Sequence, residues 1–234
     1  MLDVWKEVKV IFNKIYDILI AGGAWLTILE GLWATVQISF FALVLGTLLG
    51  AGVCAMRRSK HKILKIPASI YIAVLRGSPV LMLLMLFYYV VFAKSDVDAL
   101  VVAIITFGLN TAAYIAELMR SALDATDKGQ VEAMRTLGFS GFAAFRYVTL
   151  PQAAEIAKPV YQSTIINLIQ WTSVVGYVTI TDLTRVINNI SARTMQPLFM
   201  IIVGMIIYLG LSYLVTGIFA LSDRIKKRKA GAKK

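Results

Sequence analysis

Cysteine, histidine and charged residues are all scarce in this sequence of 234 residues. It has one cysteine, Cys54, and one histidine, His61, and Asp, Glu, Lys and Arg together make up 16% of the chain. A single cysteine cannot form an intrachain disulfide, and the apolar neighbours of Cys54 indicate a packing role. His61 has no cysteine or carboxylate at ligand spacing, so the sequence predicts no metal site.

The low content of charge is matched by a high content of apolar residues. Hydrophobic residues make up 59% of the sequence, and the mean hydropathy is +0.75. Soluble domains are about 45–50% apolar and about 25% charged. The composition therefore predicts an integral membrane protein. Asp3 and Glu7 near the start, with no cleavage-like site after them, argue against a secretory signal peptide.

Five apolar segments are long enough to cross a bilayer, for which a helix needs about 20 residues. They cover residues 25–56, 67–93, 97–120, 151–180 and 197–221. Residues 1–24 precede them with apolar side chains on one helical stripe, which predicts an amphipathic helix lying in the membrane interface. The predicted fold is an all-α integral membrane domain of five spans over residues 25–222, followed by a basic tail at 223–234.

The positions of Lys and Arg predict the orientation of these spans, because cytoplasmic loops carry the excess of positive charge. Most of the 24 Lys and Arg residues fall on one side, in the connections 57–65 and 120–158 and in the tail. We therefore expect the N-terminus outside and the C-terminus in the cytoplasm. The net charge of +11 then follows from topology and some attraction to anionic lipid, and no nucleic-acid partner is expected.

A charged stretch, EAMRTLGFSGFAAFRYVTLP, interrupts the apolar pattern at residues 132–151. Ala133, Met134 and Leu137 fall on one face of a short helix. Gly138 is a natural helix stop, and Pro151 suits the first turn of the next span. Amphipathicity alone is equally typical of an ordinary helix that rests on lipid headgroups.

The spacing within this stretch is more specific than its amphipathicity. Glu132-Ala133, Gly138 and Val148-x-Leu150-Pro151 resemble the EAA signature (EAA-x3-G-x9-I-x-LP) of the membrane subunits of ABC importers. Around it, YIAVLRGSPVLM (71–82), NTAAYIAELMRSALDATDKG (110–129), YVTLPQA (147–153) and TSVV (172–175) resemble the polar amino-acid permease branch. The resemblance covers most of residues 25–220.

This resemblance implies a type I ABC importer fold in which the region 129–150 contains a coupling helix that docks into a cytoplasmic ATPase. The docking and coupling residues that it implies are Glu132, Ala133, Met134, Leu137, Gly138, Leu150 and Pro151. Met134 stands where the family has a third alanine, and a flexible methionine can still fill an apolar cleft.

The resemblance also implies the partners of such a subunit. The chain has no G-x4-G-K-[ST] loop, so ATP and Mg²⁺ are expected on a partner ATPase dimer and this chain is not expected to be an enzyme. A second permease chain, the same or similar, would complete the path through the lipid membrane. An extracytoplasmic amino-acid-binding protein would deliver the substrate.

Polar residues inside the spans are the candidates for a substrate path, because charges and amides are costly there. Two groups meet this description: Arg76, Asn110, Tyr114 and Glu117 in the second and third spans, and Gln170, Trp171, Thr172 and Ser173 in the fourth. Arg76 is expected to line the path, to reach the interface at a broken helix, or to pair with Glu117. The other residues are equally suited to hydrogen bonding between helices.

The family often has a lysine and then an acidic or amide residue where Gln170 and Trp171 stand. This departure favours a zwitterionic amino acid over a strongly charged one. Two rival functions stay open. A secondary transporter would use Glu117 as a proton site, although no inverted repeat is visible in the sequence. A membrane-anchor or assembly protein would use the amphipathic helix for docking only.

Overall fold

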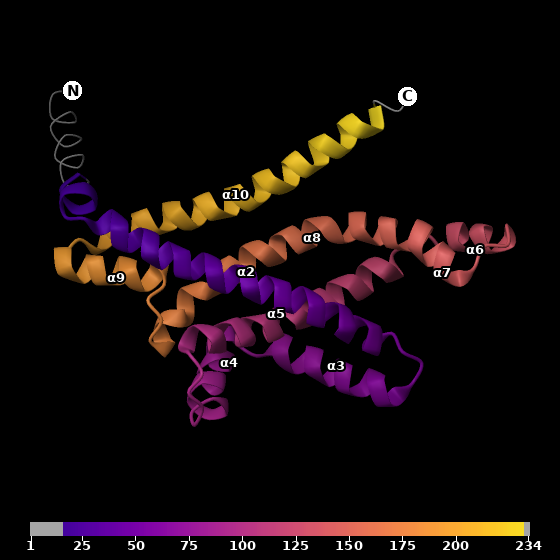
Figure 1. The fold of residues 1–234 in the computed structure, drawn as a ribbon, viewed down its shortest axis with the longest axis horizontal. Helices are drawn as coiled ribbons and strands as arrows, with labels where there is room; N and C mark the ends of the chain where they lie inside the picture. Colours follow the sequence, from indigo (N-terminus) through magenta and orange to yellow (C-terminus); the bar gives the residue numbers. More distant parts are fainter. Residues whose placement is uncertain (1–15, 232–234) are drawn as a thin grey trace.

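The computed structural model describes residues 16–231, and that part of the chain consists of helices joined by short connections (Figure 1). The predicted interfacial helix of residues 1–24 lies largely outside the described residues. The elements are η1 (Asp17–Ala21), α2 (Ala24–Arg57), α3 (Lys62–Gly77), α4 (Val80–Leu86), η2 (Phe87–Val91), α5 (Ala99–Asp124), α6 (Lys128–Thr136), α7 (Gly141–Ala144), η3 (Phe145–Thr149), α8 (Leu150–Trp171), η4 (Thr172–Val178), α9 (Leu183–Thr194) and α10 (Pro197–Gly231).

Helices α2 and α5 pack closely along their length and form the central pair of the bundle. Glycines make this approach possible: a Cβ on Gly46 would lie 2.9 Å from the Thr111 side chain, and a Cβ on Gly108 would lie 2.6 Å from Leu45. Small residues at helix contacts allow the backbones of membrane helices to come together, where packing and not the hydrophobic effect supplies the attraction. Helix α5 is accordingly the most buried of the long apolar helices.

One buried cluster joins this pair to the short elements around it. Its members come from α2, α4, α5, α8, η4 and the connection after η4, and they are Ile38, Ala42, Leu84, Ala103, Phe107, Leu168, Val175, Val178 and Ile180. The cluster therefore fixes the position of the broken second span and of the turn that follows α8. Both of these regions carry predicted path residues.

The second predicted span is broken as its sequence indicates. Helix α3 ends at Gly77, and the segment 80–91 leaves it at an angle of 109°. Ser78 and Pro79 are residue types that suit the cap and the first residue of a new helix, but neither takes that place here. The hydroxyl of Ser78 donates to the carbonyl of Val74 within α3, at 2.8 Å, and Pro79 is the residue that precedes α4.

The predicted spans differ in how well length and composition support them. Helices α2, α5 and α10 can each cross a membrane, and the bent pair of α3 with α4–η2 can serve as a fourth span. Helix α8 has 22 residues, but its polar side chains keep it out of this set. It also ends at Trp171, earlier than the predicted span of 151–180, because the chain tightens into the 3-10 helix η4.

The last helix extends through the predicted basic tail. Helix α10 continues without a break to Gly231, so the described residues of the tail prolong the fifth span. Lys158 of α8 pairs with Asp223, and Glu155 of α8 pairs with Lys226. The α2–α3 turn, α6, α7 and the C-terminal end of α10 lie toward one end of the molecule (Figure 1). The segments with most of the positive charge thus share one end.

Candidate functional site

The segment predicted to couple to an ATPase forms a small helix with defined ends. Asp127 caps α6, since its Oδ1 accepts a hydrogen bond from the amide of Gly129 at 2.9 Å. At the other end, the amide of Gly138 donates to Arg135 O at 3.0 Å and the amide of Phe139 donates to Met134 O at 3.2 Å. These two bonds form a Schellman motif, which requires a left-handed residue, and Gly138 has φ of 85°. The helix stop predicted at Gly138 is confirmed.

The tip beyond this stop exposes large apolar side chains. Leu137 is 75% exposed, Phe142 is 73% exposed and Phe139 is 47% exposed. Met134 is half-buried, whereas Glu132 and Ala133 are exposed on α6. Exposed apolar patches next to polar residues are typical of interaction sites. Of the predicted docking residues, Leu137 belongs to an exposed apolar surface, together with Phe139 and Phe142, which the comparison with the EAA pattern did not single out.

The connection from α6 to α8 differs from the prediction. Only one turn, residues 137–140, follows α6, because Ser140 caps a second helical segment with its hydroxyl accepting from Ala143 N at 3.1 Å. From Gly141 the chain stays helical through α7, η3 and α8 to Trp171. Leu150 and Pro151, both exposed, open α8 with the proline in its first turn, as the sequence predicts, but the helical turn η3 and not a loop precedes them. The π-helical turn η3 lies just before Pro151, where a missing amide interrupts regular α-helical bonding.

A glutamine on α8 ties the coupling segment to the spans. The side-chain amide of Gln152 donates to Gln130 Oε1 at 2.6 Å, and its own Oε1 accepts from the amide of Asp127 at 3.4 Å. These two hydrogen bonds link the start of α6 to the start of α8. Gln152 lies one residue beyond the EAA motif, in the segment YVTLPQA. Its contact with Gln130, 22 residues earlier, matches no sequence pattern and could not be predicted.

Three predicted path residues meet at one place in the bundle. The guanidinium of Arg76, in the last turn of α3, lies 5.2 Å from the ring centroid of Tyr114. The Tyr114 ring in turn packs against Trp171 with centroids 5.1 Å apart. A cation over an aromatic face is an attractive arrangement. Arg76 therefore reaches Tyr114 and not Glu117, so the suggested pairing of Arg76 with Glu117 is wrong.

The amide of Asn110 connects the third span to the break in the second. Asn110 is 2% exposed, and its Nδ2 donates to Leu75 O at 2.7 Å. Its Oδ1 has no hydrogen-bond partner among the described residues. Asn110, Tyr114 and Glu117 all face the protein interior or its clefts, as their spacing on one stripe indicates.

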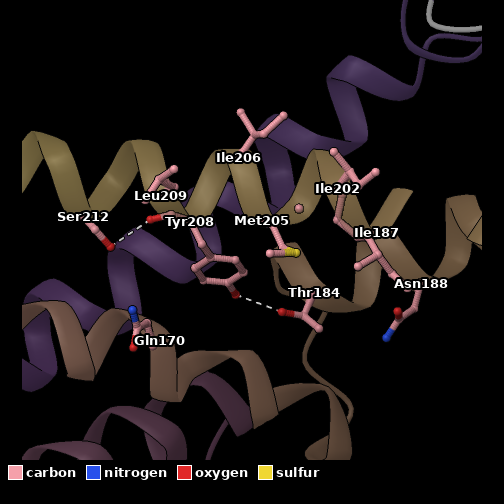
Figure 2. Close-up of a pocket in the computed structure, with 12 residues that line it drawn as sticks. Gln170, Thr184, Ile187, Asn188, Ile202, Met205, Ile206, Tyr208, Leu209 and Ser212 are labelled. Carbon is pink, nitrogen blue, oxygen red and sulfur yellow. Dashed lines mark hydrogen bonds between the residues drawn. The ribbon is translucent and has the colours of Figure 1, made fainter. Parts of the chain in front are cut away.

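The residues after α8 point in different directions. Thr172 is buried and donates its hydroxyl to Ile169 O at 2.7 Å, and Ser173 is half-buried in η4. Gln170 instead faces a cavity of about 570 Å³ between the end of α8, α9 and α10 (Figure 2). Trp171, the next residue, packs on Tyr114. Only Gln170 of this group lines that cavity.

The cavity that Gln170 faces is mostly apolar with a few polar groups at its edge. Figure 2 shows the Tyr208 and Thr184 hydroxyls hydrogen-bonded to each other, at 2.9 Å. Asn188 and Ser212 complete the polar part of the lining, and Ile187, Ile202, Met205 and Ile206 are among its apolar residues. Apolar pockets with a small number of polar groups are typical of small-molecule sites.

Glu117 lies apart from this cavity, in a cluster of charges between α2 and α5. Its Oε1 accepts from Arg120 Nε at 3.1 Å, and its Oε2 lies 3.5 Å from Arg57 Nε. Asp124 pairs with both Arg58 and Arg120. Asp124 is therefore held in ion pairs and is not simply a solvated surface charge. Glu117 forms ion pairs with the guanidinium groups of Arg57 and Arg120. It belongs neither to the aromatic stack of Tyr114 and Trp171 nor to the lining of the cavity.

Comparison with known proteins places this architecture in a family. Residues 23–228 match the family described as the binding-protein-dependent transport system inner membrane component, and the chain belongs to it. A probable amino-acid ABC transporter permease protein, YckA of Bacillus subtilis (strain 168), is 33% identical over 86% of this chain and 88% of its own length. The histidine/lysine/arginine/ornithine transport system permease protein HisM of Salmonella typhimurium is 27% identical over 83% of this chain and 87% of its own.

Solved structures agree with this assignment. A chain of an amino acid ABC transporter, crystallised with histidines, superposes with a TM-score of 0.80 at 30% identity and covers 89% of this chain and 98% of its own. A chain of the inward-facing MetNI methionine ABC transporter superposes with a TM-score of 0.66 at 23% identity and shares the fold. The protein is thus a membrane-embedded permease subunit with the type I ABC importer fold.

Proposed function

We propose that this permease subunit serves an ATP-driven importer of amino acids and that α6 with the tip 137–142 is its coupling element. The observation that carries the proposal is the exposed apolar tip, with Leu137 and Phe142 both more than 70% exposed, placed at the end of a rigidly capped helix. Such a tip fits an apolar cleft on a partner, and ATP with Mg²⁺ would be bound by that partner.

The connection of the coupling element supports this mechanism. Gln152 and the continuous helical path from Gly141 to Trp171 link the tip to the region of Trp171 and Gln170. A shift of the tip when an ATPase dimer closes would therefore move the end of α8 as well. With a second permease chain, the same or similar, this movement would open the path at their interface to each side of the membrane in turn, which is alternating access.

The polar residues at the end of α8 support an amino-acid substrate with no strong net charge. Gln170 offers a neutral amide to the cavity between α8, α9 and α10, and Trp171 with Tyr114 offers an aromatic wall. Arg76, beside Tyr114, is suited to a substrate carboxylate. We infer an extracytoplasmic binding protein as the donor, with the N-terminus outside and the C-terminus in the cytoplasm.

Uptake measurements in proteoliposomes test this function. The permease is reconstituted with its ATPase and binding protein, and labelled neutral, acidic and basic amino acids are offered with and without internal ATP. We expect uptake that needs ATP and prefers a neutral amino acid. Uptake that ignores ATP and follows a proton gradient would instead establish a secondary transporter, and no uptake with all partners present would favour an assembly role.

Two variants test whether Gln170 and Trp171 determine which amino acids are transported. Gln170→Ala and Trp171→Ala are expected to change the competition profile among amino acids, while Asn189→Ala, at an exposed position on α9, leaves it unchanged. Identical profiles for all three variants would remove Gln170 and Trp171 from the substrate path.

A further inference from the structure

A basic cavity lies where α2, α3 and α5 meet, toward the end of the bundle that carries the coupling segment. It has a volume of about 420 Å³ and is lined almost entirely by polar residues. These residues are Arg57, Arg58, Ser59, Lys65, Ser69, Arg120 and Asp124. Neither the aromatic stack around Tyr114 nor the cavity of Figure 2 shares a residue with it.

The charges at this cavity do not balance within the described chain. Four of its lining residues are cations and one is a carboxylate. Glu117, next to the lining, adds a second carboxylate, but both carboxylates are already engaged by Arg57, Arg58 and Arg120. Lys65 has no ion-pair partner between residues 16 and 231. Two positive charges are thus left over, which a bound anion can compensate.

The level of the cavity in the membrane indicates the source of that anion. Helix α2 has 34 residues, so at a rise of about 1.5 Å per residue it is longer than a hydrocarbon core of about 30 Å. Arg57 is its last residue, and Arg58 and Ser59 follow. The cavity therefore lies at the level of the lipid headgroups, where each Lys or Arg attracts anionic lipid.

The chemistry of the lining is suited to phosphate oxygens. Guanidinium groups donate pairs of parallel hydrogen bonds to phosphate, and hydroxyl and ammonium groups add single ones. Ser59 and Ser69 supply the hydroxyls, and Lys65 supplies the free ammonium. Basic pockets between membrane helices bind anionic headgroups in the same way.

We propose that this cavity binds a phosphate group, with the phosphodiester of an anionic lipid as its source, and that the bound lipid holds the ends of α2, α3 and α5 together. The proposed site is inferred from the charges and the shape of the cavity, and it is independent of the identity of the transported substrate. A soluble phosphate would use the same donors, so the experiment must separate the two sources.

The experiment measures binding to the delipidated complex in detergent by native mass spectrometry and by thermal shift. Phosphatidylglycerol, phosphatidylcholine and inorganic phosphate are added separately. We expect phosphatidylglycerol to bind and to raise the Tm more than phosphatidylcholine does. Lys65→Gln should weaken the apparent affinity for phosphatidylglycerol roughly ten-fold, the factor expected for losing one direct hydrogen bond between charged groups.

Lys62→Gln is the matched control, because Lys62 lies one turn earlier on α3, is exposed and does not line the cavity. It should keep the wild-type affinity, and both variants should keep the wild-type Tm in phosphatidylcholine. Binding of inorganic phosphate alone, lost in Lys65→Gln, would support the phosphate site with a soluble source. Equal effects of the two lipids with no phosphate effect, or equal losses in Lys65→Gln and Lys62→Gln, would overturn the proposal.

Discussion

Two glycines in α2 give a sharp test of how the bundle is packed. A Cβ added to Gly50 would lie 2.9 Å from Ile115 Cγ2 and 3.0 Å from the backbone oxygen of Ala112, both on α5. A Cβ added to Gly52 would meet nothing within 4 Å. Since backbone atoms of α5 cannot move aside cheaply, Gly50→Ala should be overpacked, which costs about 1–3 kcal/mol.

The comparison between the two variants removes the main competing effect. Replacing a helical glycine with alanine favours the helix by about 0.5–1 kcal/mol in water. That gain applies to Gly50→Ala and Gly52→Ala alike and cancels in their difference. The difference of about 1–3 kcal/mol corresponds to a Tm lower by roughly 2–12 °C for Gly50→Ala, at about 2–4 °C per kcal/mol for a chain of this size.

Thermal unfolding of the purified complex in detergent measures this difference. Gly52→Ala should unfold at or slightly above the wild-type Tm, and Gly50→Ala well below it. Equal Tm values for the two variants would show that α2 and α5 are not in the close contact described here, and the position of the charge cluster between them would then be wrong as well.

Three further predictions concern the ends of the helices. Asp182 is fully buried, and this burial raises the pKa of its carboxyl above the usual value. The folded wild type should therefore lose stability relative to Asp182→Asn as the pH rises from about 4 towards neutrality, because the carboxyl must then ionise while buried. Unfolding measurements across that pH range test this. Thr184→Val removes the hydrogen bond to Tyr208 and should lower the free energy of unfolding by about 1 kcal/mol, an effect that should vanish in a Tyr208→Phe background. Gln152→Ala breaks the link to Gln130 and should reduce ATP-driven uptake several-fold while the ATPase still co-purifies; unchanged uptake would exclude Gln152 from coupling.

The sequence predicted those features that depend on local chemistry. The stop at Gly138 follows from a backbone conformation that only glycine adopts easily, and the break at residues 76–79 follows from a glycine and a proline separated by one serine. The segregation of Lys and Arg to one end likewise needs no knowledge of packing. These predictions hold because each one rests on a few neighbouring residues.

Predictions that depended on contacts across the bundle were less successful. Pairing with Glu117 was one of three alternatives for Arg76, but α2 brings Arg57 to Glu117 instead, from 60 positions earlier in the sequence. Pro151 was expected in the first turn of the next span and lies there, but the helical path through α7 and η3 that leads to it was not predicted. A single sequence without a structure gives no information on which helix lies beside which, so neither outcome was accessible.

The central claim is that α6 and the turn at Gly138 couple ATP hydrolysis to transport. Gly138 has φ of 85°, where an alanine is disfavoured by about 1–2 kcal/mol, and Gly23, before α2 and outside the coupling element, has φ of 65° with nothing within 4 Å of an added Cβ. The most direct measurement is ATP-driven amino-acid uptake by proteoliposomes containing Gly138→Ala or Gly23→Ala in the full complex. The account predicts that uptake falls in Gly138→Ala, with the complex still assembled, and stays at the wild-type level in Gly23→Ala. Wild-type uptake by both variants, or an equal loss in both, would contradict it.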